Sequence, residues 1–325
     1  MGLVQRRRLL VAFGGLLVAP PSAWTQPRTV RIGVLSPRRE SVILKPVLAR
    51  LSELGYVEGR NLRLEYRSAD GVVDRFPGLA RELIEAKCDL IFAAGSMYPA
   101  RALRDATTSV PIIIVAIDYD PVKTGIVTNL RRPGGNITGV AFSAPEVVAK
   151  RVEFLREVLP QATRFLVFSD PYSAEQFESM RQTAQQLGVQ LVAHTFESRP
   201  YAFEAAFEQG EKAGVAALLL PTSPVFFDRR ATIYEIAMKR RLPLAVGGSA
   251  WWTGTGWLVG YGVIVDKTYA RAGDIAASIL KGKPPGEIPV EQPSDFEFAV
   301  NLRTAKAIGI KIPQSVLVRA SRIVE

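Results

Sequence analysis

The side chains that carry most nucleophilic and metal chemistry are scarce in this chain. Its 325 residues include one cysteine, Cys88, and one histidine, His194. A single cysteine cannot form an intrachain disulfide, and these two side chains supply too few ligands for a structural zinc site. Every Ser-His-Asp or Cys-His arrangement would also have to include His194, which lies within a strand-like run. The sequence therefore predicts no bound metal and disfavours nucleophilic catalysis.

Side chains suited to reversible binding follow the strand-like runs of the first half. They are Ser36 at the end of the first run, Ser96 and Tyr98 after the third, and Asp118 after the fourth. The Ser96 hydroxyl and the amides of the next helix could hold an anion, but capping of that helix would also explain a serine here. Asp118 could bind a ligand ammonium, whereas we interpret Asp120 as the cap of a following helix.

The second half offers a similar set after its own strand-like runs. Aromatic rings at these positions could stack on an aromatic or apolar solute, although adjacent aromatic residues more often pack in a core. Trp251 and Trp252 are the stronger candidates because they lie on a turn after a strand. The predicted ligand-binding residues of this half are Tyr172, Thr222, Ser223, Ser249, Trp251 and Trp252.

Two series of alternating strands and helices must position these residues. Strands are predicted at 30–36, 62–67, 89–94, 112–117 and 139–142, and again at 165–169, 190–195, 216–220, 243–246 and 258–261. Runs that are apolar at nearly every position, such as 112–115, are typical of parallel strands covered by helices on both faces. The spacing predicts an α/β fold with two doubly wound parallel-sheet lobes and a ligand cleft between them.

The first residues have the layout of an export signal. Arg6, Arg7 and Arg8 precede an apolar run at 9–19, which is shorter than a membrane span of about 20 residues. We expect residues 1–25 to be a signal peptide and the protein to be periplasmic, with twin-arginine export as an alternative route. A lipid anchor is not expected, because no cysteine lies near the cleavage zone.

The net charge and the glycine pattern argue against nucleic-acid-binding proteins and nucleotide-dependent enzymes. The chain carries 41 basic and 31 acidic residues, or +10, and removal of three arginines with residues 1–25 leaves 38 minus 31, or +7. This charge is spread over helix faces, so no nucleic-acid partner is predicted. The first strand-to-helix turn, at 33–40, lacks the glycines of a dinucleotide site, and no P-loop occurs, so no cofactor is expected. An enzyme on a Rossmann-like scaffold is therefore only a minor alternative.

Several segments together resemble the tryptophan/tyrosine-type family of ABC-transporter substrate-binding proteins, whose fold is similar to that of type I periplasmic binding proteins. The combination spans nearly the whole chain after the signal and includes RIGVLSP from Arg31, LSELGYVEGRNLRLEYRSADG from Leu51, DPVKTGIVTNLRRPGGNITGVAF from Asp120, KRVEFLREVLPQATR from Lys150, and ILKGKPP with PVEQP from Ile279. The resemblance implies a receptor that closes two lobes around a small organic solute and delivers it to ABC permease subunits. We expect the protein to be a monomer.

The resemblance also implies lobe boundaries. Residues 28–143 and about 262–288 would form lobe 1, residues 144–261 and about 289–300 would form lobe 2, and the tail at 301–325 is not assigned to either. The chain departs from the family pattern at 96–99, at Tyr119 and at 250–256, so specificity for aromatic amino acids does not follow. A sensory protein that presents its ligand to a membrane receptor is the alternative function.

Overall fold

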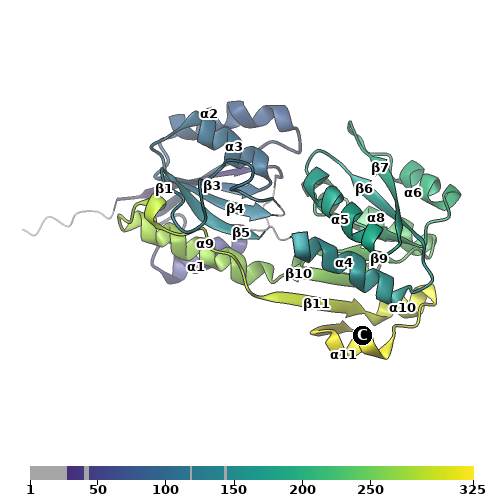
Figure 1. The fold of residues 1–325 in the computed structure, drawn as a ribbon. Helices are drawn as coiled ribbons and strands as arrows, with labels where there is room; N and C mark the ends of the chain where they lie inside the picture. The colour runs from purple at the N-terminus through teal and green to yellow at the C-terminus, as the bar shows by residue number, and fades with distance from the viewer. Residues whose placement is uncertain (1–27, 40–43, 118, 143–144) are drawn as a thin grey trace, which may run out of the picture.

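The computed structural model consists of two α/β lobes that lie side by side (Figure 1). It describes residues 28–39, 44–117, 119–142 and 145–325. The expected signal at 1–25, the candidate Asp118 and the expected lobe boundary at 143–144 lie outside the described residues. Among the described helices, none has both the length and the apolar character needed to cross a membrane.

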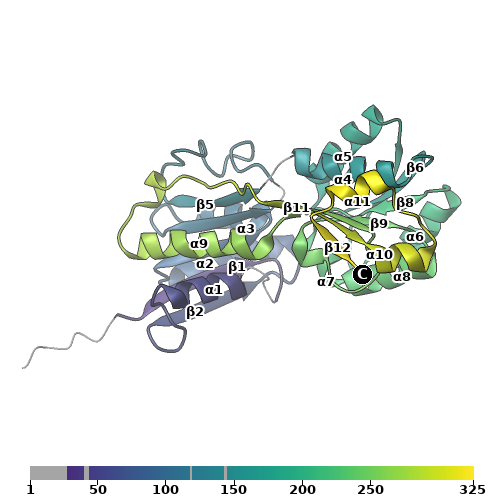
Figure 2. The same cartoon turned by 90° about the horizontal axis from the view of Figure 1, so that it is seen from below.

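The first lobe contains a parallel sheet with the strand order β2-β1-β3-β4-β5. Its strands are β1 (Val30–Ser36), β2 (Leu62–Ser68), β3 (Leu90–Gly95), β4 (Ile112–Ile117) and β5 (Ile137–Phe142). One face is covered by α1 (Leu44–Glu53) and α9 (Val265–Leu280), and the other by α2 (Phe76–Glu85) and α3 (Met97–Ala106). The short helices η1 (Val73–Arg75) and η3 (Pro285–Glu287) complete this lobe. In the view of Figure 2, α9 lies beside α1, although more than 200 residues separate them in the sequence.

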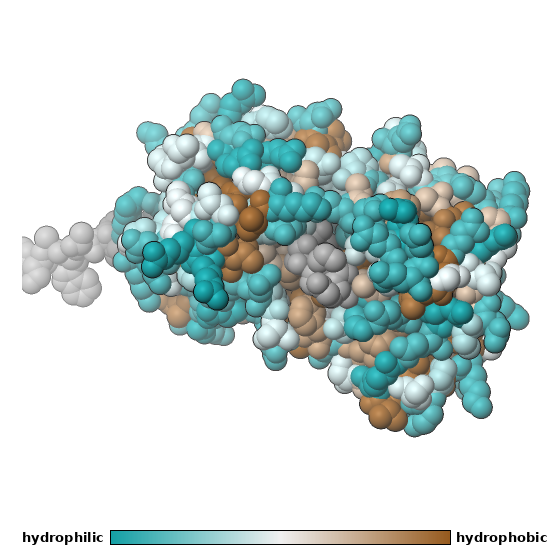
Figure 3. Space-filling view, viewed as in Figure 1, coloured by the Kyte–Doolittle hydropathy of each residue, from teal (hydrophilic) through white to brown (hydrophobic). Residues whose placement is uncertain are grey.

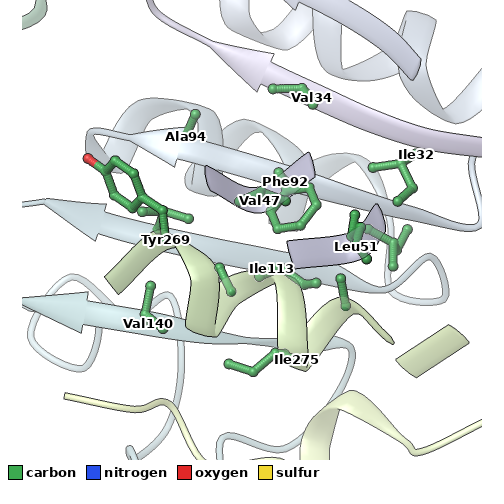
Figure 4. Close-up of a cluster of buried hydrophobic side chains, with 14 of the residues drawn as sticks. Ile32, Val34, Val47, Leu51, Phe92, Ala94, Ile113, Val140, Tyr269 and Ile275 are labelled. Carbon is green, nitrogen blue, oxygen red and sulfur yellow. The ribbon is translucent and has the colours of Figure 1, made fainter. Parts of the chain in front are cut away.

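The β4 strand shows why this sheet needs helices on both faces. Ile113 and Val115 point into the core under α1 and α9, whereas Ile112 and Ile114 point into the core under α2 and α3. Successive side chains of a strand point to opposite faces, so a strand that is apolar throughout must be covered twice. Figure 4 shows the first of these cores, with Val47 of α1 among the packed side chains.

The second lobe contains a larger sheet with the order β12-β11-β10-β9-β8-β6-β7. Its pairs are parallel except for β10 and β11, which are antiparallel. The elements up to β10 are α4 (Pro145–Val158), β6 (Arg164–Ser169), α5 (Ala174–Gln186), β7 (Gln190–Thr195), α6 (Phe203–Lys212), β8 (Ala217–Leu219), α7 (Pro224–Asp228), α8 (Arg230–Lys239), β9 (Leu244–Val246), η2 (Ser249–Trp251) and β10 (Val259–Val263). The predicted class, an α/β fold with two parallel-sheet lobes, is confirmed, and the antiparallel pair is an addition to it.

The C-terminal tail packs on the second lobe. It follows β11 (Phe296–Asn301) and contains α10 (Leu302–Ile308), α11 (Gln314–Arg319) and β12 (Arg322–Val324). The Asn301 side chain accepts a hydrogen bond from the Thr304 amide at 3.1 Å and caps α10. Ala305, Ile312 and Val316 then join the core beneath α4. The sequence prediction contained neither β11 nor β12.

The chain passes between the lobes after β5, after β10 and before β11. The last of these connections runs beside β5, where the Glu291 amide donates to the Gly139 carbonyl at 2.9 Å. On the face drawn in Figure 3 the surface is largely hydrophilic, and apolar residues form small separate patches. The apolar side chains are concentrated in the cores of the two lobes.

Gly139 in β5 occupies a position where the neighbouring strand leaves no room for a side chain. Its φ is +147°, and a Cβ there would lie 2.0 Å from the carbonyl oxygen of Ile114 in β4. We expect Gly139→Ala to lower the free energy of unfolding by about 2–4 kcal/mol, because backbone strain and overpacking act together. Gly78→Ala in α2, where a Cβ meets open space, should leave the free energy unchanged or slightly higher. Urea titrations followed by circular dichroism measure both, and equal stabilities would contradict the prediction.

Candidate functional site

A cavity lies between the two lobes and is lined by residues of both. Its volume is about 930 Å³, part of which is open to solvent. In both lobes the wall begins where strands end, because the carboxyl ends of parallel strands meet at one edge of a sheet. The cavity is therefore in the place where open α/β sheets bind ligands.

The first lobe contributes the ends of four strands to this wall. Ser36, Ser96, Ile117 and Phe142 line the cavity at or directly after β1, β3, β4 and β5. Helix α9 adds Tyr269, whose ring lies at the edge of the core cluster, with its hydroxyl pointing away from the other labelled side chains (Figure 4). Hydroxyl-bearing side chains thus line this wall at β1 and β3, and apolar side chains line it at β4 and β5.

Ser96 occupies the N-cap position of α3 but does not act as a cap. Its backbone is extended, with φ −76° and ψ 170°, yet its side chain makes no capping hydrogen bond. The hydroxyl is buried and has no hydrogen-bond partner among the residues that the structure describes. A buried hydroxyl without a partner is destabilising. A ligand group in the cavity could provide the missing hydrogen bond.

The wall of the second lobe combines aromatic rings with hydroxyl groups. Tyr172 comes from the turn after β6, whereas Thr222 and Ser223 come from the segment after β8. Trp251 and Phe227 also line the cavity, and their rings meet edge to face with centroids 5.1 Å apart. Trp251 and Phe227 thus add aromatic rings to this wall.

Asp170 is buried and forms hydrogen bonds with several residues of this wall. Its carboxylate accepts hydrogen bonds from the hydroxyls of Ser173 at 2.8 Å, Ser223 at 2.5 Å and Tyr201 at 3.4 Å, and from the Tyr172 amide at 3.1 Å. Burial raises the pKa of the Asp170 carboxyl, and these hydrogen bonds oppose the increase. The carboxylate therefore fixes both the Tyr172 turn and the Ser223 hydroxyl at the cavity.

Arg151 is a lining residue that the sequence analysis missed. It lies on α4, its side chain is buried with 3% exposure, and its Nε donates to the Tyr261 carbonyl at 3.0 Å. Helical spacing could have revealed it, because Arg151 falls on the same stripe as the buried Val148 and Val152. A charged residue on an apolar stripe indicates a buried polar site.

Most of the predicted ligand-binding residues are brought together at the cavity. Those that line it are Ser36, Ser96, Tyr172, Thr222, Ser223 and Trp251. Tyr98 stands just outside, with its ring edge-on to Tyr172 at a centroid distance of 5.3 Å. Burial raises the pKa of both phenols, so they remain protonated at neutral pH. Ligand contact remains a prediction for every residue of the set.

Ser249 and Trp252 have other packing partners. The Ser249 hydroxyl accepts a hydrogen bond from the Val265 amide at 3.1 Å, at the first turn of α9. The Trp252 indole N–H donates to the Gly247 carbonyl at 2.9 Å, and its ring stacks on Trp257. Neither Ser249 nor Trp252 lines the cavity. The structure therefore places them at the connection between the lobes and in the core of the second lobe.

The residues after Asp120 form a turn instead of the predicted helix. The Asp120 carboxylate accepts hydrogen bonds from the amides of Val122 at 2.8 Å and Lys123 at 3.1 Å, as a helix cap would. Gly125 has a φ of +70°, so the backbone leaves the helical conformation there. The prediction of a helix was wrong, although Asp120 makes the hydrogen bonds of a cap.

Comparison with known families identifies the group to which the chain belongs. The family model described as ABC transporter substrate binding protein matches residues 38–324. The chain belongs to this family. The family consists of substrate-binding proteins, in agreement with a cavity between two lobes.

Individual proteins are also similar to this chain in sequence or in structure. A tyrosine-binding protein from Clostridioides difficile is 26% identical over 270 residues, which cover 82% of this chain and 76% of the relative. A conserved domain protein from Vibrio cholerae is similar in structure, with a TM-score of 0.82 and 25% identity over 91% of this chain and all of that one. An ABC domain from Streptococcus pneumoniae in complex with L-Trp has a TM-score of 0.78 and 23% identity, over the same shares of each chain. The fold of this substrate-binding protein is the predicted type I periplasmic binding protein fold.

An ion pair and an aromatic ring join the lobes at the cavity of this substrate-binding protein. Arg38 of the first lobe donates from Nε to the Asp228 carboxylate of the second at 2.5 Å. The Arg38 guanidinium also lies 4.4 Å from the ring centroid of Phe227, and the Arg230 guanidinium lies 4.1 Å from it. The two Arg38 contacts require the lobes to be close together, whereas Arg230 and Phe227 both belong to the second lobe.

Two further hydrogen bonds cross between the lobes. The Tyr98 hydroxyl donates to the Pro171 carbonyl at 3.1 Å, and Arg199 donates to the Asp70 carbonyl. Gly71 gives the Arg199 guanidinium the space it needs, since a Cβ at Gly71 would lie 1.6 Å from it. The structure therefore represents a closed arrangement of the lobes, held by a small number of polar contacts.

Removing the Arg38–Asp228 pair would measure its contribution to the free energy of lobe closure. We expect Asp228→Asn to raise the ratio of open to closed ligand-free protein by about 1.4- to fivefold, because a partly exposed ion pair contributes about 0.2–1 kcal/mol. Small-angle scattering would detect this shift as a larger radius of gyration. Asp105→Asn is the matched control, because Asp105 pairs with Arg104 within the first lobe. An identical radius for both variants would contradict a role of Asp228 in closure.

Proposed function

We propose that this substrate-binding protein is exported to the periplasm, binds a small organic solute between its lobes and delivers it to the permease of an ABC importer. The solute would be an amino acid or an aromatic or carboxylate compound. The observation that carries the proposal is the cavity itself, whose wall is shared by both lobes and whose edges are joined by contacts between them.

Binding and closure are coupled in this arrangement. A ligand that touches both walls binds the closed form more tightly than the open form, and it therefore shifts the population toward closure. A solute that binds the closed form only tenfold more tightly than the open form already favours closure by about 1.4 kcal/mol, more than the roughly 0–1 kcal/mol of one partly exposed ion pair. The solute, and not the contacts between lobes, would thus determine the shape that a permease meets.

The relatives support the general ligand class. One is named a tyrosine-binding protein, and another was solved with L-Trp. The Trp251 ring in the wall suits solutes of this kind. The departures from the family pattern at 96–99 and 250–256 contribute Ser96 and Trp251 to the wall, so the solute of this protein need not be the one that a relative binds.

Ligand screening and transport assays test the function directly. We expect an amino acid or an aromatic acid to raise the melting temperature of the purified protein and to reduce its radius of gyration in scattering. Cells that lack the gene should then take up the labelled solute more slowly than the parent strain. A ligand that binds without any loss of uptake in the deletion strain would favour a sensory role.

Trp251 provides a test of the cavity as the binding site. We expect Trp251→Ala to weaken solute binding by about tenfold or more, because the variant loses the aromatic surface of one wall. Calorimetric titration measures the affinity, and urea unfolding checks that the variant remains folded. Tyr56→Leu serves as a control, because Tyr56 precedes β2 and so lies at the end of the first sheet away from the cavity. An unchanged affinity in Trp251→Ala would place the binding site elsewhere.

A further inference from the structure

We propose that Asp170 is a positioning residue that couples the cavity wall of the second lobe to closure of the lobes. Its carboxylate holds three segments of this lobe, and each segment makes a polar contact with the first lobe. The inference rests on the proposed function only in that closure would enclose a solute. It concerns the contacts between the lobes, so its test needs no identified ligand.

Asp170 directly follows β6, and only 2% of it is exposed. One carboxylate oxygen, Oδ1, accepts from the Tyr172 amide at 3.1 Å and from the Ser173 hydroxyl at 2.8 Å. The other, Oδ2, accepts from the hydroxyls of Ser223 at 2.5 Å and Tyr201 at 3.4 Å. Loss of the carboxylate would leave these donors without an acceptor, which is unfavourable for buried groups.

The first segment is the turn after β6. The Pro171 carbonyl and the Tyr172 amide belong to one planar peptide group, so the hydrogen bond from this amide to Asp170 also orients the carbonyl. That carbonyl accepts the hydrogen bond from the Tyr98 hydroxyl of the first lobe at 3.1 Å. Because Tyr172 lines the cavity, this turn carries both a wall residue and a contact between the lobes.

The second segment is the start of α7. Ser223 donates its hydroxyl hydrogen to Asp170, and the same oxygen accepts from the Val225 amide at 3.1 Å and so caps α7. The helix is five residues long and ends at Asp228, which pairs with Arg38 of the first lobe. Ser223 also lines the cavity. The cap therefore links the wall to the ion pair through a single short helix.

The third segment is the loop between β7 and α6. The Tyr201 hydroxyl donates to Asp170, and the Tyr201 ring stacks on Phe196 with centroids 4.5 Å apart. Two residues before Tyr201, the Arg199 guanidinium donates to the Asp70 carbonyl of the first lobe. The hydrogen bond from Tyr201 is the longest of the four, so we expect this contact between the lobes to depend least on Asp170.

The wall and the contacts between the lobes therefore share one acceptor. The four hydrogen bonds that Asp170 accepts all come from its own lobe, yet their donors lie next to the groups that contact the first lobe. A solute that contacts Tyr172 or Ser223 acts on residues that this carboxylate holds. Removal of the carboxylate should therefore weaken closure although Asp170 lies within the second lobe.

Distances between spin labels test this in the ligand-free protein. Labels at Glu85→Cys in α2 and Glu208→Cys in α6, both exposed and in different lobes (Figure 1), distinguish open from closed populations by electron–electron double resonance. Cys88 is buried and should not react with the label. We expect Asp170→Ala to raise the open-to-closed ratio about threefold or more, because three contacts that each contribute about 1.4-fold or more weaken together.

Val316→Ala is the control for a general loss of stability. It removes a buried side chain from the core of the second lobe beneath α4, outside the Asp170 hydrogen bonds. It should lower the urea midpoint of unfolding and leave the open-to-closed ratio unchanged. Equal ratios in Val316→Ala and Asp170→Ala would overturn the inference.

Double variants show whether the contacts depend on the carboxylate. Asp228→Asn should raise the open-to-closed ratio by about 1.4- to fivefold in the parent protein and have no further effect when combined with Asp170→Ala. Tyr98→Phe, which removes the hydroxyl that bonds to Pro171, should behave in the same way. Full effects of both substitutions in the Asp170→Ala background would overturn the inference, because the contacts would then form without the carboxylate.

Ser223→Ala gives an answer even if Asp170→Ala does not fold. This variant removes only the link between Asp170 and α7. It should abolish the effect of Asp228→Asn and preserve that of Tyr98→Phe, because the Tyr172 amide still bonds to Asp170. An undiminished effect of Asp228→Asn in the Ser223→Ala background would contradict the role of Asp170 in placing α7.

The outcomes separate this inference from the proposed function. A parent protein without a closed population would overturn the inference, since the contacts would not form in solution, and it would leave the proposed function intact. Failure of amino acids and aromatic acids to raise the melting temperature would contradict the proposed ligand class. The dependence of the closed population on Asp170 would stand in that case.

Discussion

The central strands of both sheets are buried on both faces, and this constraint determines where the protein can bind a solute. In β4 successive isoleucines alternate between two apolar cores, and β6, β8 and β9 of the second lobe are equally enclosed. Polar side chains have no place along such strands, because burial without hydrogen bonds is unfavourable. They accumulate where the strands end, and the parallel arrangement brings those ends to one edge of each sheet. The cavity between the lobes follows from this geometry.

The two walls of the cavity are organised differently. In the second lobe, Asp170 and Arg151 are both buried and hydrogen-bonded to protein groups, so the hydroxyls and rings around them are held in place. In the first lobe the Ser96 hydroxyl lacks a partner among the described residues, as the Tyr172 hydroxyl of the second lobe does. We expect the more extensively hydrogen-bonded second lobe to provide a largely fixed surface, which the first lobe completes when the lobes close. Pre-organisation of this kind reduces the entropy lost on binding.

Contacts between the lobes are few and individually weak. The Arg38–Asp228 pair and the Tyr98–Pro171 hydrogen bond lie at positions that solvent can reach, where such interactions contribute little. Open and closed arrangements should therefore differ by a small free energy. A receptor benefits from this balance, because a solute that contacts both walls can then control closure.

Periodicity in the sequence by itself determined the strands, the covering helices, the two-lobe α/β class and most of the polar residues at strand ends, because these features depend on local spacing. It did not reveal β11 and β12, which exist through pairing with β10 and with each other. Adjacent tryptophans were equivalent in the sequence, yet the short helix at Ser249–Trp251 turns Trp251 toward the cavity and Trp252 into the core. Arg151 lies far along the chain from Thr222, and only folding brings them together above Gly247. Which side chains meet at the cavity depends on such long-range contacts, so tertiary structure alone decided it.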